Sequence, residues 1–175
     1  EDPALIPWTN FVSKLKEPEF HTEIALVGKY IELADAYKSI LESIIHAGAA
    51  NKTKIKVNLI SSENINNDNV EEIFKNIKGV IVAPGFGFRG IEGKIIAIKH
   101  VRENNIPFLG ICLGMQCAVI EFGRNILNLD KAHSTEMNPK TPHPVIDIMA
   151  EQKDINEKGG TMRLGTYPCK IVKGS

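Results

Sequence analysis

Short apolar runs alternate with helical repeats along most of the chain. Four runs have the length and composition of β-strands: residues 24–27, 55–60, 79–83 and 108–111. Four other segments repeat apolar residues at helical spacing: residues 35–48, 70–77, 91–101 and 113–122. The first of these helices is expected to end at Gly48. Strands that alternate with helices predict an α/β fold with an open, mostly parallel sheet and flanking helices, whose ligands bind beyond the carboxyl ends of the strands.

The two ends of the chain depart from this rhythm. Trp8, Phe11 and Leu15 recur at helical spacing ahead of Pro18, which predicts a short amphipathic helix before the main domain. After Asn125 the pattern gives way to prolines, glycines and short apolar pieces. We expect irregular structure there, with one or two late strands from the pieces at residues 145–149 and 170–172.

Composition excludes several classes of function. The chain has 175 residues, 43% of them apolar, and its 21 Lys and Arg equal its 21 Asp and Glu, so no basic field favours nucleic acid or an anionic membrane. Its three cysteines are widely spaced without a C-x-x-C pair, so we expect no disulfide framework, no metal site and a reducing, cytoplasmic location. The longest apolar runs reach about half a membrane span.

A glycine-rich loop follows the strand predicted at residues 79–83. Residues 85–90 spell G-x-G-x-x-G between a strand and a helix, which is the context of a dinucleotide-binding fingerprint. That fingerprint also needs an acid at the end of the next strand to hold the ribose, and residues 109–112 supply none. A nucleotide-binding module remains an alternative, beside the simpler interpretation of a tight turn that needs glycine.

The turn around Cys112 is the strongest chemical signal. Residues 110–114, Gly-Ile-Cys-Leu-Gly, have the strand–nucleophile–helix form of G-x-S-x-G elbows with cysteine in place of serine. The flanking glycines permit a sharp bend, and the N-terminus of the following helix favours a thiolate. Cys112 is therefore predicted to be a nucleophile, whereas Cys117 and Cys169 are interpreted as inert buried residues. A cysteine hydrolase of another kind is a further alternative.

Residues 110–116 resemble the nucleophile motif of class I glutamine amidotransferases. Further segments, in order along the chain, are similar to those of the CTP synthase family: residues 27–30, 35–39, 85–90, 134–136 and 159–165. The resemblance covers nearly the whole chain and implies the flavodoxin-like architecture of class I amidotransferases.

The same resemblance implies roles for individual residues. Cys112 resembles the nucleophile that forms a glutamyl thioester, and the Leu113 N–H resembles an oxyanion-hole donor. Phe86 would wall the pocket, and Glu136 suits the substrate's ammonium group. The implied oxyanion and substrate-binding positions are Gly85, Phe86, Leu113, Gly114, Met115, Gln116 and Glu136.

The resemblance also implies a larger enzyme. Ammonia released from L-glutamine would pass to a synthetase domain that aminates UTP to CTP with ATP and Mg, in pyrimidine nucleotide biosynthesis, while this domain would need no cofactor. We therefore expect residues 1–20 to be a linker helix from that missing domain and residues 21–175 to be a partial amidotransferase domain. The complete enzyme is expected to be a homo-oligomer.

Two features depart from the family pattern. Pro84 stands where a backbone donor is expected, and proline has no N–H, so Gly85 is expected to supply that donor. The family's general base and its orienting acid lie in a His-Pro-Glu sequence, and His143-Pro144 is followed by Val145 instead. We therefore expect the chain to stop before its triad is complete, with slight glutamine turnover, and interpret its five histidines as surface or packing residues.

Overall fold

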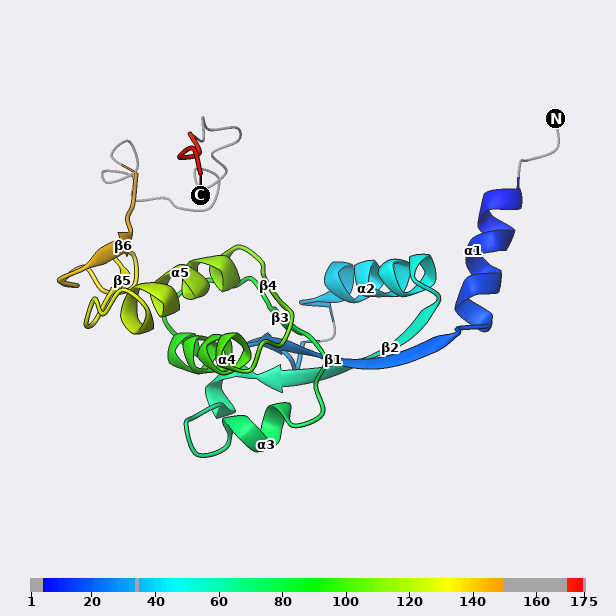
Figure 1. Ribbon diagram of the computed structural model, residues 1–175, viewed down its shortest axis with the longest axis horizontal. Helices are drawn as coiled ribbons and strands as arrows, with labels where there is room; N and C mark the ends of the chain where they lie inside the picture. Colours follow the sequence, from blue (N-terminus) through cyan, green and yellow to red (C-terminus); the bar gives the residue numbers. More distant parts are fainter. Residues whose placement is uncertain (1–4, 34, 150–169, 175) are drawn as a thin grey trace.

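The predicted strands form one parallel sheet. The computed structural model describes residues 5–33, 35–149 and 170–174 (Figure 1). The four strands are β1 (Phe20–Gly28), β2 (Thr53–Ser61), β3 (Val80–Val82) and β4 (Phe108–Gly110). They lie in the order β2-β1-β3-β4, and each neighbouring pair is parallel. The open parallel sheet predicted from the sequence is confirmed.

Helices connect the strands and cover both faces of the sheet. Their bounds are α1 (Ile6–Lys16), α2 (Lys38–Ala50), α3 (Val70–Phe74), α4 (Ile91–Glu103) and α5 (Leu113–Asn125), with a short 3₁₀ turn, η1 (Ser62–Asn64). Helix α2 lies on one side of β1 and β2 and α3 on the other (Figure 1). The layered arrangement is that of a doubly wound α/β domain.

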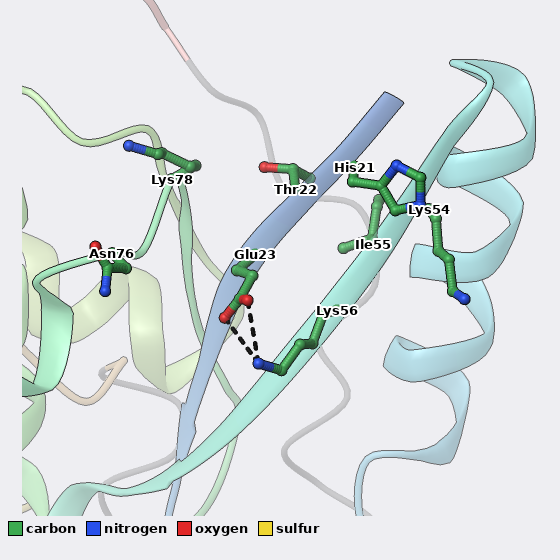
Figure 2. A pocket seen from close by; sticks show the side chains of 8 residues that line it. All are labelled: His21, Thr22, Glu23, Lys54, Ile55, Lys56, Asn76 and Lys78. Carbon is green, nitrogen blue, oxygen red and sulfur yellow. Dashed lines mark hydrogen bonds and ion pairs between the residues drawn. The ribbon is translucent and has the colours of Figure 1, made fainter. Parts of the chain in front are cut away.

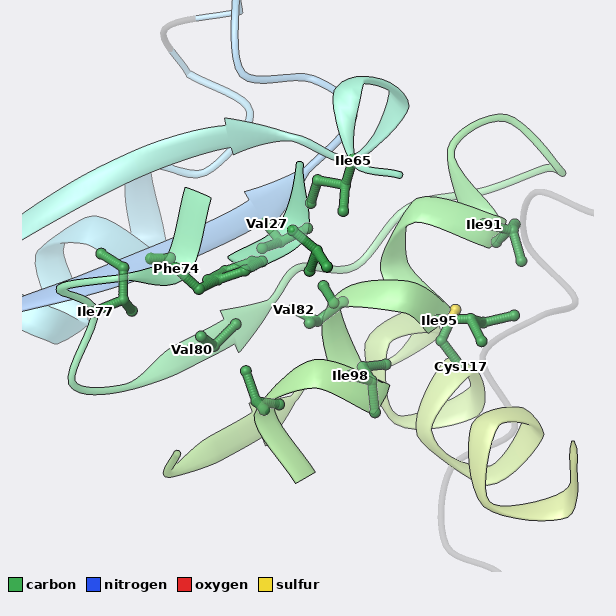
Figure 3. Close-up of a cluster of buried hydrophobic side chains, with 14 of the residues drawn as sticks. Val27, Ile65, Phe74, Ile77, Val80, Val82, Ile91, Ile95, Ile98 and Cys117 are labelled. Carbon is green, nitrogen blue, oxygen red and sulfur yellow. The ribbon is translucent and has the colours of Figure 1, made fainter. Parts of the chain in front are cut away.

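The main core lies between the sheet and helices α3, α4 and α5. Val27, Val80 and Val82 point from the strands into a cluster with Phe74 and Ile95 (Figure 3). Leu26 points to the opposite face, where it packs with Tyr37 and Ala83 beneath α2. Successive residues of β1 thus face opposite layers, which explains why residues 24–27 read as an unbroken apolar run.

Helix α2 does not stop at Gly48, so that prediction was wrong. The helix continues to Ala50, and Gly48 is buried inside it. A Cβ at Gly48 would lie 2.6 Å from the carbonyl oxygen of Thr53, so glycine is needed there because α2 presses against the start of β2. The residue that looked like a terminator serves packing instead.

Strand β1 is longer than its apolar run. It pairs with β2 along its whole length but with β3 only through Ala25, Leu26 and Val27, so the first halves of β1 and β2 project as a two-stranded ribbon towards α1 (Figure 1). The lining side chains of a groove of about 700 Å³ at the base of this ribbon are His21, Thr22, Glu23, Lys54, Ile55, Lys56, Asn76 and Lys78 (Figure 2). This groove lies at the amino ends of the strands, away from the edge where α/β folds bind ligands.

The predictions for the two ends of the chain are confirmed in part. The predicted N-terminal helix is confirmed as α1, whose Phe11 ring meets His46 of α2 at 5.1 Å. The late strands are β5 (His133–Ser134) and β6 (Pro144–Ile146), which pair with each other, whereas residues 170–172 form no strand. Among the described helices, none has both the length and the apolar character that crossing a bilayer requires.

Candidate functional site

Cys112 occupies the turn between β4 and α5. Strand β4 ends at Gly110 and α5 begins at Leu113, so the predicted strand–cysteine–helix order is confirmed. Cys112 has φ 53° and ψ −109°, a backbone conformation that L-residues rarely adopt, and its side chain is exposed. Such strain persists only where the surrounding structure enforces it, and it is frequent at functional sites.

The glycines on either side of Cys112 permit this turn. A Cβ at Gly110 would lie 2.7 Å from the backbone N of Met115, and a Cβ at Gly114 would overlap the carbonyl oxygen of Val82. The backbone N–H of Ile111 donates to that same carbonyl at 3.0 Å. The turn is therefore pressed against the end of β3, and only glycine fits at both flanking positions.

The glycine loop after β3 reaches the cysteine turn. A Cβ at Gly85 would lie 3.7 Å from Leu113 Cδ2, in ordinary van der Waals contact. Strands β3 and β4 are parallel neighbours, so the loops at their carboxyl ends meet at one edge of the sheet. The structure thus brings Gly85 together with Leu113, the residue after Cys112.

Two backbone donors are free at this junction. In the described part of the chain, the N–H groups of Gly85 and Leu113 donate to no acceptor. Leu113 is the first residue of α5, where helical N–H groups lack partners within the helix and the helix dipole is positive. Free N–H groups beside an exposed thiol can stabilise an oxygen that becomes negative.

Two buried lysines donate hydrogen bonds to backbone carbonyls of the glycine loop and of Ala83 just before it. Lys94 of α4 donates from Nζ to the carbonyl of Ala83 at 2.7 Å. Lys29, which follows β1, donates to the carbonyl of Phe86 and to that of Gly87, the latter at 3.2 Å. Burial lowers the pKa of Lys94 to about 8, and burial and then Arg89 lower the pKa of Lys29.

Neither lysine was assigned a role from the sequence, although signals for both were present. Lys94 falls on the stripe of α4 that also carries Ile91, Ile95 and Ile98, so a charged residue stands where the helical repeat expects an apolar one. Lys29 lies in one of the segments that carry the family resemblance. The backbone N–H of Lys29 donates to the Tyr37 hydroxyl at 3.1 Å. This bond holds the backbone of Lys29 in place while its side chain extends to the loop.

The remaining predicted substrate-binding residues lie in two places. Met115 is half-exposed and Gln116 is partly buried on the first turn of α5, where the Gln116 N–H donates to the Cys112 carbonyl at 3.1 Å. Phe86 is exposed on the glycine loop. Glu136 lies in the turn after β5, and among the described residues its carboxylate has no hydrogen-bond or ion-pair partner and no such link to Cys112.

The histidines are engaged elsewhere in the described structure. His133 accepts the Ser134 N–H on Nδ1 at 2.9 Å, and its Nε2 lies 3.9 Å from Glu92. Burial and then Arg124 lower the pKa of His133, while Glu92 raises it. His46 meets the Phe11 ring edge to face, and His100 stacks on Phe74.

The remaining predictions concern the other two cysteines, the motif at residues 159–165 and a metal site. Cys117 is fully buried one turn into the body of α5, and burial raises its pKa to about 11, as expected for an inert thiol. Cys169 and residues 159–165 lie outside the described residues. Within the described ranges, no three His, Cys, Asp or Glu side chains gather as a metal site would require.

Comparison with known proteins places this geometry in a family. The profile described as "Glutamine amidotransferase class-I" matches residues 32–175. The chain is 63% identical to a CTP synthase of Flavobacterium johnsoniae over 97% of its own length and 32% of that protein, and 59% identical to one of Cytophaga hutchinsonii over 99% and 32%. It thus spans about a third of the length of the curated relatives it matches.

A solved structure agrees with the sequence relatives. The glutaminase domain of Trypanosoma brucei CTPS, solved with bound acivicin, superposes with a TM-score of 0.70 at 37% identity, over 76% of this chain and 52% of that one. The fold, the cysteine turn and the family profile therefore agree, and the chain belongs to the class-I glutamine amidotransferase family.

Proposed function

We propose that this chain is the glutamine-hydrolysing part of a CTP synthase, with Cys112 as the nucleophile. The observation that carries the proposal is the junction at the carboxyl ends of β3 and β4. There Cys112 presents an exposed thiol on its strained turn and is followed by Leu113, whose N–H is free in the described structure. The Leu113 side chain lies near Gly85, whose N–H is also free there. The high identity to CTP synthases supports glutamine as the substrate.

The chemistry follows from these groups. The Cys112 thiolate attacks the side-chain amide carbon of glutamine, so a C–S bond forms and the carbonyl oxygen becomes negative. The N–H groups of Leu113 and Gly85 stabilise that oxygen. When the C–N bond breaks, the nitrogen takes up a proton and leaves as ammonia, and water then cleaves the thioester to glutamate. A positioned acid–base group must carry these protons.

Other side chains would hold the substrate. The Glu136 carboxylate, which lacks a partner among the described residues, suits the ammonium group of glutamine. Gly114, Met115 and Gln116 would border the substrate on the first turn of α5, and Phe86 would wall the opposite side. His133 is an unsuitable base, since both of its ring nitrogens face Ser134 and Glu92.

The proposal extends to a larger enzyme. Ammonia would pass to a synthetase domain that uses ATP and Mg to aminate UTP, within a cytoplasmic homo-oligomer. Residues 1–20, which include α1, would link that domain to residues 21–175. The exposed Ile6 and Trp8 side chains of α1 support this role, because the described structure leaves them without a covering layer.

The test separates the two half-reactions in the full-length protein. Cys112→Ala should abolish CTP formation from glutamine but leave CTP formation from added ammonia within about twofold of wild type, because the second site needs only free ammonia. Cys117→Ala, which removes a buried thiol from the same helix, is the matched control and should retain both activities. Equal loss of both activities in Cys112→Ala would count against the proposal.

A further inference from the structure

Lys94 is a fully buried lysine on the core-facing side of α4. Its exposure is 0%, and its Nζ donates to the Ala83 carbonyl. An ammonium group loses its hydration on burial, so a protein retains one in its interior only where hydrogen bonds and charge compensate. An apolar residue would satisfy the helical repeat at this position, so packing alone does not explain the lysine.

The carbonyl that Lys94 holds immediately precedes the candidate oxyanion donor. Ala83 is followed by Pro84 and Gly85. The proline ring fixes φ of Pro84 at about −65°. Only ψ of Pro84 is then left to change the direction of the Gly85 N–H relative to that of the Ala83 carbonyl. Holding that carbonyl therefore restricts where the Gly85 N–H points.

Lys29 restrains the same loop on its other side. Its Nζ donates to the carbonyls of Phe86 and Gly87, directly after Gly85. The peptide that carries the Gly85 N–H thus lies between two segments that are each held by a buried lysine. The loop needs this support because its own backbone forms no regular secondary structure.

Lys94 keeps its charge at neutral pH despite its burial. Burial is the largest influence on the pKa of Lys94 and, together with Lys29, lowers it to about 8, while Cys117 and Cys112 oppose that shift. The side chain is therefore mostly an ammonium group at neutral pH, which makes its hydrogen bond to Ala83 charge-assisted.

We infer that Lys94 is a positioning residue, which orients the Gly85 N–H for oxyanion binding by holding the Ala83 carbonyl. The inference rests on the proposed function, since it assigns the Gly85 N–H a part in amide cleavage. Lys94 itself is fully buried, so it would act on the reaction through the loop. Its removal should loosen the loop and slow acyl transfer without disturbing the thiol.

Limited proteolysis of the full-length protein tests the anchoring independently of activity. Lys94→Met keeps the apolar stem but loses the donor, and it should speed chymotrypsin cleavage after the exposed Phe86 and Phe88 several-fold. Lys99→Met, on an exposed position of the same helix, is the matched control and should leave the cleavage rate unchanged. An unchanged cleavage rate in Lys94→Met overturns the inference. If that variant fails to fold, Lys94→Gln, too short to reach Ala83, takes its place with the same expectation.

Kinetics test the consequence for catalysis. Losing one oxyanion donor typically costs about 10²–10³ in kcat, so mispositioning it in Lys94→Met should lower kcat for ammonia release from glutamine at least about tenfold. Alkylation of Cys112 by iodoacetamide develops no oxyanion and should stay within about threefold of wild type. A parallel fall of both rates, or an unchanged kcat, overturns the inference. Failure of the wild type to release ammonia refutes the proposed function instead, while chymotrypsin cleavage after Phe86 and Phe88 still decides the anchoring.

Discussion

Gly114 lies against the carbonyl of Val82, so no side chain fits between α5 and β3 at that point. Adding a methyl group by Gly114→Ala would force α5 and the adjacent Cys112 away from the sheet, because the obstacle is backbone. We expect the free energy of unfolding to fall by about 1–3 kcal/mol, the usual cost of overpacking a core. Urea denaturation followed by circular dichroism measures this change.

A second glycine provides the control. At Gly79 an added Cβ would lie 3.4 Å from the Ile24 side chain, an ordinary contact, so Gly79→Ala should alter stability by less than about 1 kcal/mol. Similar losses from both substitutions would mean that close approach at Val82 is not what requires Gly114.

The ion pair between Arg102 and Glu121 joins α4 to the helix that begins beside the nucleophile. Three Arg102–Glu121 contacts of 2.8–3.1 Å hold a carboxylate that is 1% exposed. Arg102→Met should lower the free energy of unfolding by about 3 kcal/mol, the low end for a broken buried pair, because solvent still reaches the arginine.

Glu103 is the matched control for this pair. It lies 3.4 Å from the same guanidinium but is half-exposed, so Glu103→Gln should change stability by less than about 1 kcal/mol. Denaturation of both variants in one buffer compares the two effects. Equal losses of stability from Arg102→Met and Glu103→Gln would mean that the buried Glu121 contributes no more to the ion pair than the half-exposed Glu103.

The buried Lys94 should make stability rise with pH above about 8. Burial lowers its pKa from 10.5 to about 8, so between these values the unfolded chain binds more protons than the native one. Between pH 7.5 and 9 the wild type should gain about 1 kcal/mol relative to Lys94→Met. Urea midpoints at the two pH values measure the difference, and parallel pH profiles would refute it.

Cys117 should be far less reactive than Cys112 in the native protein. Cys117 is 0% exposed and burial raises its pKa to about 11, whereas the Cys112 side chain is exposed. Brief treatment with iodoacetamide at pH 7.5 should label Cys112 at least about 100-fold faster, as peptide mass analysis would measure. In denaturant the two rates should converge, and comparable rates in the native protein would contradict the assigned burial.

The sequence predicted those parts of the fold that depend on apolar periodicity. The four strands, the helices and the Cys112 turn were found because buried runs and a glycine-flanked cysteine leave local patterns. The polar start of β1 was missed, because its residues pair with β2 through the backbone and exposed pairs such as Glu23 and Lys56. Composition does not reveal such pairing.

Long-range contacts explain the other errors. Gly48 looked like a helix terminator because the approach of the Thr53 carbonyl depends on how α2 packs against β2. Lys94 received no role because its acceptor, Ala83, lies on another element. The sequence placed Gly85 and Leu113 in one site through their family resemblance, whereas their proximity follows from the adjacency of β3 and β4.

The central claim is that Cys112 is the nucleophile of a glutamine site. A glutamine analogue that carries an electrophilic group in place of its side-chain amide tests it most directly when the modified residue is mapped by mass spectrometry. We predict a single adduct on Cys112 whose formation is slowed by L-glutamine and not by D-glutamine. An adduct on Cys117 or Cys169 instead, or labelling of Cys112 that L-glutamine does not slow, would contradict the account.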